Sequence, residues 1–220
     1  RMDIAAQMPD HIMHLVGAPA RSFYSDPRIN AFAGAAVAAY YRLDAPAAGG
    51  DSYNYEIEAM GGKLIYSDVG MPTIDFREPF VAKPADLAKV KPPADWLSAG
   101  RVRFAWESAR LISEVTGGKT LSFCAPFSMA VGLRSYPLLI RDLKRNPAFA
   151  HELFARLVDE VLPGTARWRR DHDLEHKQRA GVLDADAWLY TAEAGRLRGS
   201  AARVQAVADC RLARLFLMLL

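Results

Sequence analysis

The spacing of apolar residues predicts a helix that begins near Asp26. Asp26 and Pro27 form a helix start, because an Asp side chain accepts hydrogen bonds from free backbone N–H groups and Pro tolerates the first helical position. Apolar residues then recur at intervals of three and four as far as about Asp44, which predicts one buried face. The residues predicted to form that face are Ile29, Phe32, Ala33, Ala36, Val37 and Tyr40.

Two further stretches have helical spacing. The first covers 98–116 and is closed by Gly117 and Gly118, which are typical of a helix C-terminus. The second begins at Asn146 and Pro147, carries an apolar face, and is predicted to stop at Pro163 and Gly164.

Short apolar runs between these helices predict strands. The stretch 63–66 follows two glycines, and 120–124 is rich in β-branched and aromatic residues, as buried strands are. The stretch 71–96 contains five prolines and is predicted to be a long surface excursion with a short turn near 86–90. Alternating strands and long helices favour an α/β protein with parallel strands, and a barrel is favoured over an open sheet.

Composition limits the classes of function. The chain has 220 residues, 51% of them hydrophobic, which is enough for one sizeable core. Its net charge is +3, and its Lys and Arg residues are interspersed with Asp and Glu along most of the chain. Because these basic residues form no single patch, no nucleic-acid partner is expected. No run approaches the length of a membrane span, and no membrane partner is expected. The two cysteines lie far apart, which predicts no disulfide framework and a cytoplasmic location.

Two segments carry candidate chemistry. The stretch DSYNYEIEAMG, from Asp51 to Gly61, places acidic, amide and aromatic residues ahead of a turn, and the stretch FCAPFSMA, from Phe123 to Ala130, runs from an apolar segment into a loop with a proline. Barrel enzymes place reacting groups at such strand ends. The candidate catalytic residue is Asp51, and the candidate substrate-binding residues are Arg21, Tyr53, Asn54, Glu56, Cys124, Pro126, Phe127 and Ser128.

Plainer interpretations stay open for these residues. Asp51 is also what a turn after two glycines would contain. Asn54 and Glu56 fit a solvated strand or helix face equally well, and Cys124 fits a small buried hydrophobe. No metal ligand is assigned, because His172 and His176 lack the HExxH pattern and lie among charged residues.

The order of these motifs resembles the uroporphyrinogen decarboxylase superfamily, which includes corrinoid-linked methyltransferases. The resemblance covers about 40–168. It is carried by the cluster at 51–61 leading into KLIYSD, the proline-rich stretch ending KPPADW, the segment CAPFSMA and the helix NPAFAHELFARLVDEVLPG. It implies a (β/α)8 TIM-barrel type of α/β fold with the active site at the C-terminal rim. Because a whole barrel needs about 250 residues, an incomplete barrel over 1–170 and a divergent helical tail over 171–220 are expected.

Differences between this sequence and the family pattern indicate which branch of the superfamily it resembles more. The decarboxylase branch carries an Arg-Gln-Ala-Gly-Arg loop, where this chain has GAPARSF and offers only Arg21, and a Tyr of the family pattern falls at Gly132. A corrinoid-linked methyltransferase-like activity is therefore preferred, with a small-molecule or corrinoid-protein substrate. For that branch the resemblance implies zinc and a corrinoid methyl donor, although its His-x-Cys zinc motif is absent. The alternatives are uroporphyrinogen decarboxylase, a lyase of porphyrin biosynthesis, and a non-catalytic truncated barrel that self-associates as a homo-oligomer.

Overall fold

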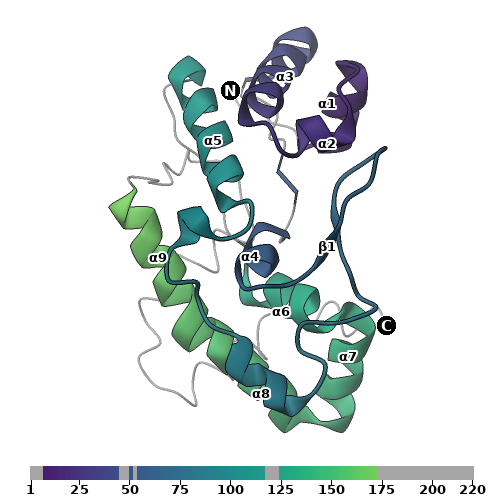
Figure 1. Ribbon diagram of the computed structural model, residues 1–220, viewed down its shortest axis with the longest axis vertical. Helices are drawn as coiled ribbons and strands as arrows, with labels where there is room; N and C mark the ends of the chain where they lie inside the picture. Colours follow the sequence, from purple (N-terminus) through teal and green to yellow (C-terminus); the bar gives the residue numbers. More distant parts are fainter. Residues whose placement is uncertain (1–6, 45–49, 52–53, 117–123, 173–220) are drawn as a thin grey trace.

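The computed structural model describes residues 7–44, 50–51, 54–116 and 124–172. Within these ranges the fold is mostly helical, with one small sheet of two strands. The N-terminal helices lie at one end of the molecule and the helices after residue 124 lie largely at the other, with the short helix α4 (Asn54–Ala59) between them (Figure 1). The predicted tail, 171–220, lies outside the described residues except for Asp171 and His172.

Three helices form the N-terminal end, and the longest of them was predicted. They are α1 (Pro9–Leu15), α2 (Ala20–Phe23) and α3 (Pro27–Tyr41). The helix start at Asp26 is confirmed, because its side chain accepts from the backbone N–H of Arg28 at 2.8 Å. These helices enclose a small core of their own, built around Ile12, Met13, Phe23 and Tyr24.

The buried face predicted for α3 is only partly right. Ala33 and Val37 are buried, but Phe32 and Tyr40 are 59% and 72% exposed. Ala36 is exposed as well, so the prediction is wrong for Phe32, Ala36 and Tyr40. The helix packs against α1 and α5 (Val102–Thr116) through small side chains, which leaves its larger aromatic residues outside the contact.

The small sheet follows α4. Strand β1 (Leu64–Ile65) lies within the predicted stretch 63–66, and it pairs with β2 (Thr73–Ile74) in antiparallel register, Leu64 opposite Ile74. No parallel strand is present in the described ranges, so they do not show the (β/α)8 barrel. The other predicted strand, 120–124, lies outside them except for Cys124.

The proline-rich stretch is only partly the predicted surface excursion. Many of its residues are exposed and the predicted short turn near 86–90 is confirmed, but several of its apolar residues are buried. It contains two short 3-10 helices, η1 (Pro84–Lys89) and η2 (Trp96–Ser98). Its prolines prevent longer regular structure, yet its apolar side chains still point inward at irregular intervals. Val81, Leu87, Val90 and Trp96 are all buried in the main core.

The helices α5, α6 (Pro126–Arg134), α7 (Tyr136–Arg145) and α8 (Pro147–Arg156) follow. The predicted helices over 98–116 and from Pro147 are confirmed. The predicted stop at Pro163 and Gly164 is wrong, because α8 continues through a π-helical turn, η3 (Leu157–Val161), into α9 (Leu162–Asp171). Pro163 falls directly after that wider turn, and Gly164 allows close packing, since an added Cβ would lie 2.9 Å from Pro92.

A buried ion pair ties the proline-rich stretch to these helices. The Nε atom of Arg134 donates to Asp142 at 2.7 Å, and one of its terminal nitrogens donates to the carbonyl oxygens of Val81 and Ala82 at 2.9 and 2.7 Å. Arg134 and Asp142 are each 5% exposed. Because removing one partner would leave a buried charge, the pair fixes the path of this stretch across the end of α6.

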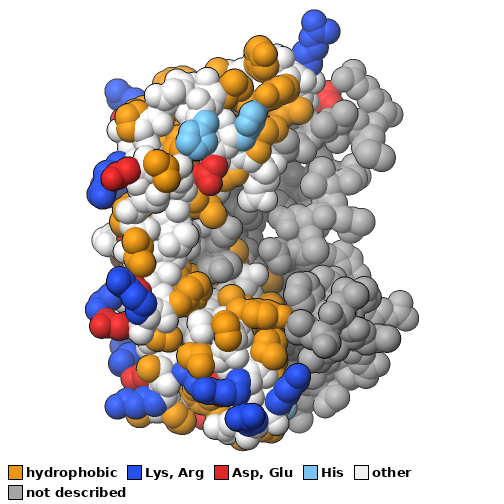
Figure 2. All heavy atoms as spheres, turned by 90° about the vertical axis from the view of Figure 1, so that its right-hand side faces the viewer, with side chains coloured by type: hydrophobic (Ala, Val, Ile, Leu, Met, Phe, Trp, Pro, Cys, Tyr) orange, Lys and Arg blue, Asp and Glu red, His pale blue; other side chains and the backbone are white. Residues whose placement is uncertain are grey.

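The side of the molecule that carries the strands has a mixed surface. In Figure 2 hydrophobic side chains are spread over this face, and Lys and Arg side chains gather at its lower end. The exposed apolar residues of the strand region are Ile65, Val69 and Phe76. Among the described residues, no helix combines the length and apolar character needed to cross a membrane.

Candidate functional site

The short helix α4 brings the predicted acidic cluster into the core. Asn54, Tyr55, Glu56 and Ile57 are all buried, because α5, α6 and β2 pack around this helix. The interpretation of Asn54 and Glu56 as a solvated face is therefore wrong. Gly132 of α6 lets the two helices approach closely, since a Cβ built there would lie 2.6 Å from the Ile57 side chain.

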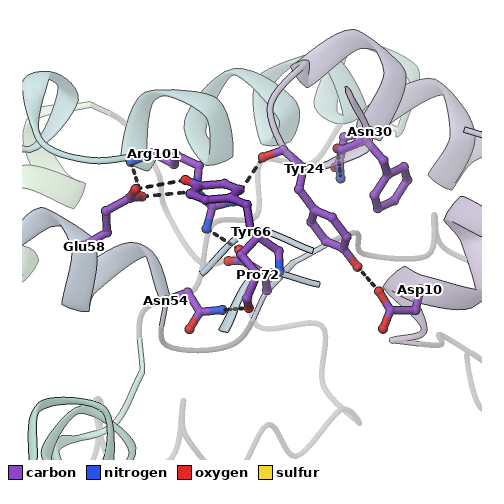
Figure 3. Close-up of polar contacts among 10 residues, drawn as sticks. Asp10, Tyr24, Asn30, Asn54, Glu58, Tyr66, Pro72 and Arg101 are labelled. Atoms are coloured by element: carbon purple, nitrogen blue, oxygen red, sulfur yellow. Dashed lines mark hydrogen bonds and ion pairs between the residues drawn. The ribbon is translucent and has the colours of Figure 1, made fainter. Parts of the chain in front are cut away.

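Arg101 lies just before α5 and gathers groups from three distant parts of the chain (Figure 3). Its Nε donates to Glu58 at 3.1 Å, and one terminal nitrogen donates to the carbonyl oxygen of Tyr24 at 3.0 Å. The other terminal nitrogen forms an ion pair with Asp51. Because Asp51 is fully buried and the Arg101 side chain is only 10% exposed, solvent screens this pair weakly.

Aromatic rings and a second acidic contact hold Arg101 in place. Its guanidinium lies over the rings of Tyr55 and Tyr66, 5.4 and 5.3 Å from their centroids. The Tyr66 hydroxyl donates to Glu58 at 3.0 Å, and the Arg101 backbone N–H donates to the same carboxylate at 3.0 Å. We call Arg101, Asp51, Glu58, Tyr55 and Tyr66 the Arg101 cluster.

Burial makes Asp51 an unusual carboxyl group. Loss of hydration raises the pKa of Asp51 to about 6, although the Arg101 charge and hydrogen bond work in the opposite direction. The charge of Glu58 raises the pKa further. The Oδ1 atom of Asp51 is buried and has no hydrogen-bond partner among the described residues. Asp51 can thus exchange a proton not far below neutral pH.

Glu56 connects the two predicted segments. Its Oε1 accepts a hydrogen bond from the backbone N–H of Cys124 at 2.5 Å. This bond brings the stretch 51–61 together with the stretch 123–130, which we call the CAPF segment. The Oε2 atom of Glu56 is buried and finds no hydrogen-bond partner within the part of the chain that the structure describes. Burial raises the pKa of Glu56 to about 7, against the effect of hydrogen bonds from Cys124. Glu56 is therefore poised to hold or release a proton near neutral pH.

The residues of the CAPF segment lie at a helix start and not in a loop. Pro126 is the first residue of α6, and Phe127 and Ser128 belong to its first turn. Pro126, Phe127 and Ser128 are all half-buried, and the Phe127 ring stacks on Phe154 with centroids 6.4 Å apart. Cys124, just before the helix, is the residue of this segment whose backbone donates a hydrogen bond to an acidic side chain of α4.

The other candidates lie in different surroundings. The Asn54 amide donates to the carbonyl oxygen of Pro72 at 2.7 Å, which joins α4 to the start of β2. Arg21 lies on the surface, where its Nε pairs with Asp68 at 2.9 Å and both side chains are mostly exposed. The structure thus does not bring Arg21 to Asp51. Tyr53 lies outside the described residues.

Two features of the site remain to be compared with the sequence analysis: the possible metal ligands and the role of Arg101. Within the described part of the chain, no group of three His, Cys, Asp or Glu side chains is arranged to hold a metal ion. Arg101 was not predicted, although it organises the site. Its partners lie 43, 50 and 77 residues away, so no local pattern could have indicated it.

Taken together, the geometry supports proton transfer. Two carboxyl groups, those of Asp51 and Glu58, pair with the Arg101 guanidinium, and a third, that of Glu56, lies on the same helix as Glu58; the pKa values of Asp51 and Glu56 are raised. Of the two groups with raised pKa values, Glu56 has the higher one, so it is the group that changes its protonation state closest to neutral pH. Groups tuned in this way are common at catalytic sites.

Comparison with known proteins identifies a fold. No family model matches the chain, and no curated protein matches its sequence. Among solved structures, the fold is similar to that of a methyltransferase from Methanosarcina mazei, with a TM-score of 0.59 and 20% sequence identity. The similarity covers 72% of this chain and 48% of that one, so this chain spans about half the length of that protein.

Proposed function

We propose that this protein is a corrinoid-linked methyltransferase-like member of the uroporphyrinogen decarboxylase superfamily. The observation that carries the proposal is the fold shared with the methyltransferase from Methanosarcina mazei over 72% of the chain. The superfamily itself is proposed from the order of the sequence motifs, which resembles the family pattern and does not depend on that comparison. The (β/α)8 barrel of the family belongs to this proposal, with the site near its C-terminal rim.

The proposed site lies where α4, the start of α5 and the segment before α6 meet. Asp51 is its proposed catalytic carboxylate, held by Arg101, and Glu56 holds or releases a proton beside it. A proton acceptor near neutral pH suits a transfer in which a thiol acceptor must lose its proton. The substrate is a small molecule or a corrinoid protein.

The zinc ion implied by the family resemblance does not fit the described residues. They contain no set of three candidate ligands, and Cys124 is the one cysteine among them. Zinc in that branch would supply a Lewis acid for thiol activation. No step is therefore assigned to a metal in this site, and the proposed proton chemistry is that of Asp51 and Glu56.

The decarboxylase alternative receives less support. It needs a cationic group near Asp51 to bind substrate carboxylates, and Arg21 is the family position available for that role. Arg21 instead pairs with Asp68 on the surface, while Arg101 is already engaged by Asp51 and Glu58. The methyltransferase-like proposal therefore ranks first.

The test is a pair of parallel assays on the full chain. One contains methylcobalamin, a small thiol and added zinc, and the other contains uroporphyrinogen, with metal analysis of the same preparation. We expect demethylation of methylcobalamin and no loss of uroporphyrinogen. Asp51→Asn should reduce methyl transfer by a factor on the order of 100 or more, while Asp68→Asn, a matched change on the surface, should leave it unchanged. Consumption of uroporphyrinogen alone would overturn the proposal.

A further inference from the structure

Cys124 and Glu56 form a pair whose chemistry goes beyond the proposed methyl transfer. The backbone of Cys124 is fixed on Glu56 by the 2.5 Å hydrogen bond to Oε1. The second oxygen of Glu56 is also buried and has no hydrogen-bond partner in the described ranges, and Glu56 as a whole is 1% exposed. Cys124 itself is half-buried and carries a thiol that is not in a disulfide. Cys124 is thus the more exposed residue of the pair.

The position of Cys124 favours a negative charge on that sulfur. Cys124 lies immediately before Ala125, the N-cap of the nine-residue helix α6, and the Ala125 side chain makes no capping hydrogen bond to this helix. The N-terminal end of a helix carries partial positive charge and stabilises a thiolate. A negative charge is therefore better placed at Cys124 than on the enclosed carboxylate of Glu56.

We infer that Cys124 is a nucleophilic thiol that reacts with small alkyl electrophiles, with Glu56 as its proton acceptor. In this step the thiol proton passes to the Glu56 carboxylate. The sulfur forms a bond to the electrophilic carbon, whose bond to its leaving group breaks, and the leaving group departs with the electron pair. The site needs neither a metal nor a corrinoid.

Two features of the surroundings support this direction of proton transfer. Burial raises the pKa of Glu56 to about 7, which brings it closer to that of an ordinary thiol and makes the carboxylate a stronger base. The negative charge of Asp51 acts on Glu56 in the same sense. Transfer of the proton to Glu56 removes a charge from the interior and so relieves the cost of burying it.

The experiment measures alkylation of the folded full chain by iodoacetamide at neutral pH, with peptide mass spectrometry to follow Cys124 and Cys210 separately. We expect Cys124 to react faster in the folded protein than in the same chain unfolded in guanidinium chloride. Glu56→Gln should slow the alkylation of Cys124 by a factor on the order of 100 and leave the alkylation rate of Cys210 unchanged. The matched control is Glu78→Gln, which alters a carboxylate that is mostly exposed.

The direction in which Glu56→Gln changes the alkylation rate of Cys124 separates this proposal from its alternatives. If Glu56 were only structural, its replacement would loosen the segment and Cys124 would react faster. If it were only a nearby negative charge, its removal would stabilise the thiolate and again increase the rate. An unchanged or faster reaction in Glu56→Gln would overturn the proposal. The wild type alone provides a second test. If Cys124 reacts more slowly in the folded protein than in the unfolded chain, the proposal is also overturned.

Discussion

Replacing Glu56 by Gln should change how the stability of the protein depends on pH. The folded pKa of Glu56 is about 7, above its ordinary value of 4.5, because the side chain is buried. Between these values the folded protein binds more protons than the unfolded chain, so its free energy of unfolding falls as the pH rises. The Gln variant keeps the size of the side chain and cannot ionise.

The size of the effect follows from the two pKa values. Their separation corresponds to about 3 kcal/mol, at 1.36 kcal/mol for each pH unit. Glu56 is 1% exposed, so solvent screening reduces this figure little. The stability of Glu56→Gln relative to wild type should therefore rise by about 3 kcal/mol between about pH 4 and about pH 8.

Urea unfolding followed by tryptophan fluorescence at a series of pH values measures this difference. Glu78→Gln serves as the control, because Glu78 is 69% exposed and its ion pair with Lys63 is open to solvent. If wild type and Glu56→Gln lose stability in parallel as the pH rises, the buried carboxyl is not the group that titrates, and the reasoning about the site is refuted.

Three other substitutions test the fold around the site, each by urea unfolding. Arg101→Ala should cost about 3 to 5 kcal/mol, because it leaves Asp51 buried without its cation; a loss below about 1 kcal/mol would mean that the pair is solvated. Gly132→Ala should cost about 1 to 3 kcal/mol by pushing against Ile57, and a stabilised variant would contradict this close packing. Asp26→Ala should cost about 1 kcal/mol through loss of a helix cap, so an unchanged stability would show that the cap contributes nothing.

Elements that depend on local signals could be predicted from the sequence. Asp26 and Pro27 indicated the start of α3, and the spacing of apolar residues indicated α5 and the beginning of α8. These features depend on contacts between residues a few positions apart. The same reasoning failed at Pro163, because a π-helical turn, which has no strong sequence signal, lets the helix pass through the proline.

Features that depend on distant contacts could not be predicted. The side chains of Val81, Leu87 and Val90 are buried at spacings that match neither a helix nor a strand, because the rest of the fold directs them. Arg101 resembles any surface arginine until its partners, which are far away in the sequence, are known. The contact between Glu56 and Cys124 likewise spans 68 residues, although both were candidates from their motifs.

The central claim is that the enclosed carboxyl groups around Arg101 and α4 serve methyl transfer. Its most direct test is the rate at which the full chain demethylates methylcobalamin in the presence of a thiol, compared between wild type and Glu56→Gln. The account predicts measurable transfer by the wild type and a loss on the order of 100-fold in the variant. Equal rates in the two proteins, or no transfer by the wild type with zinc supplied, would contradict it.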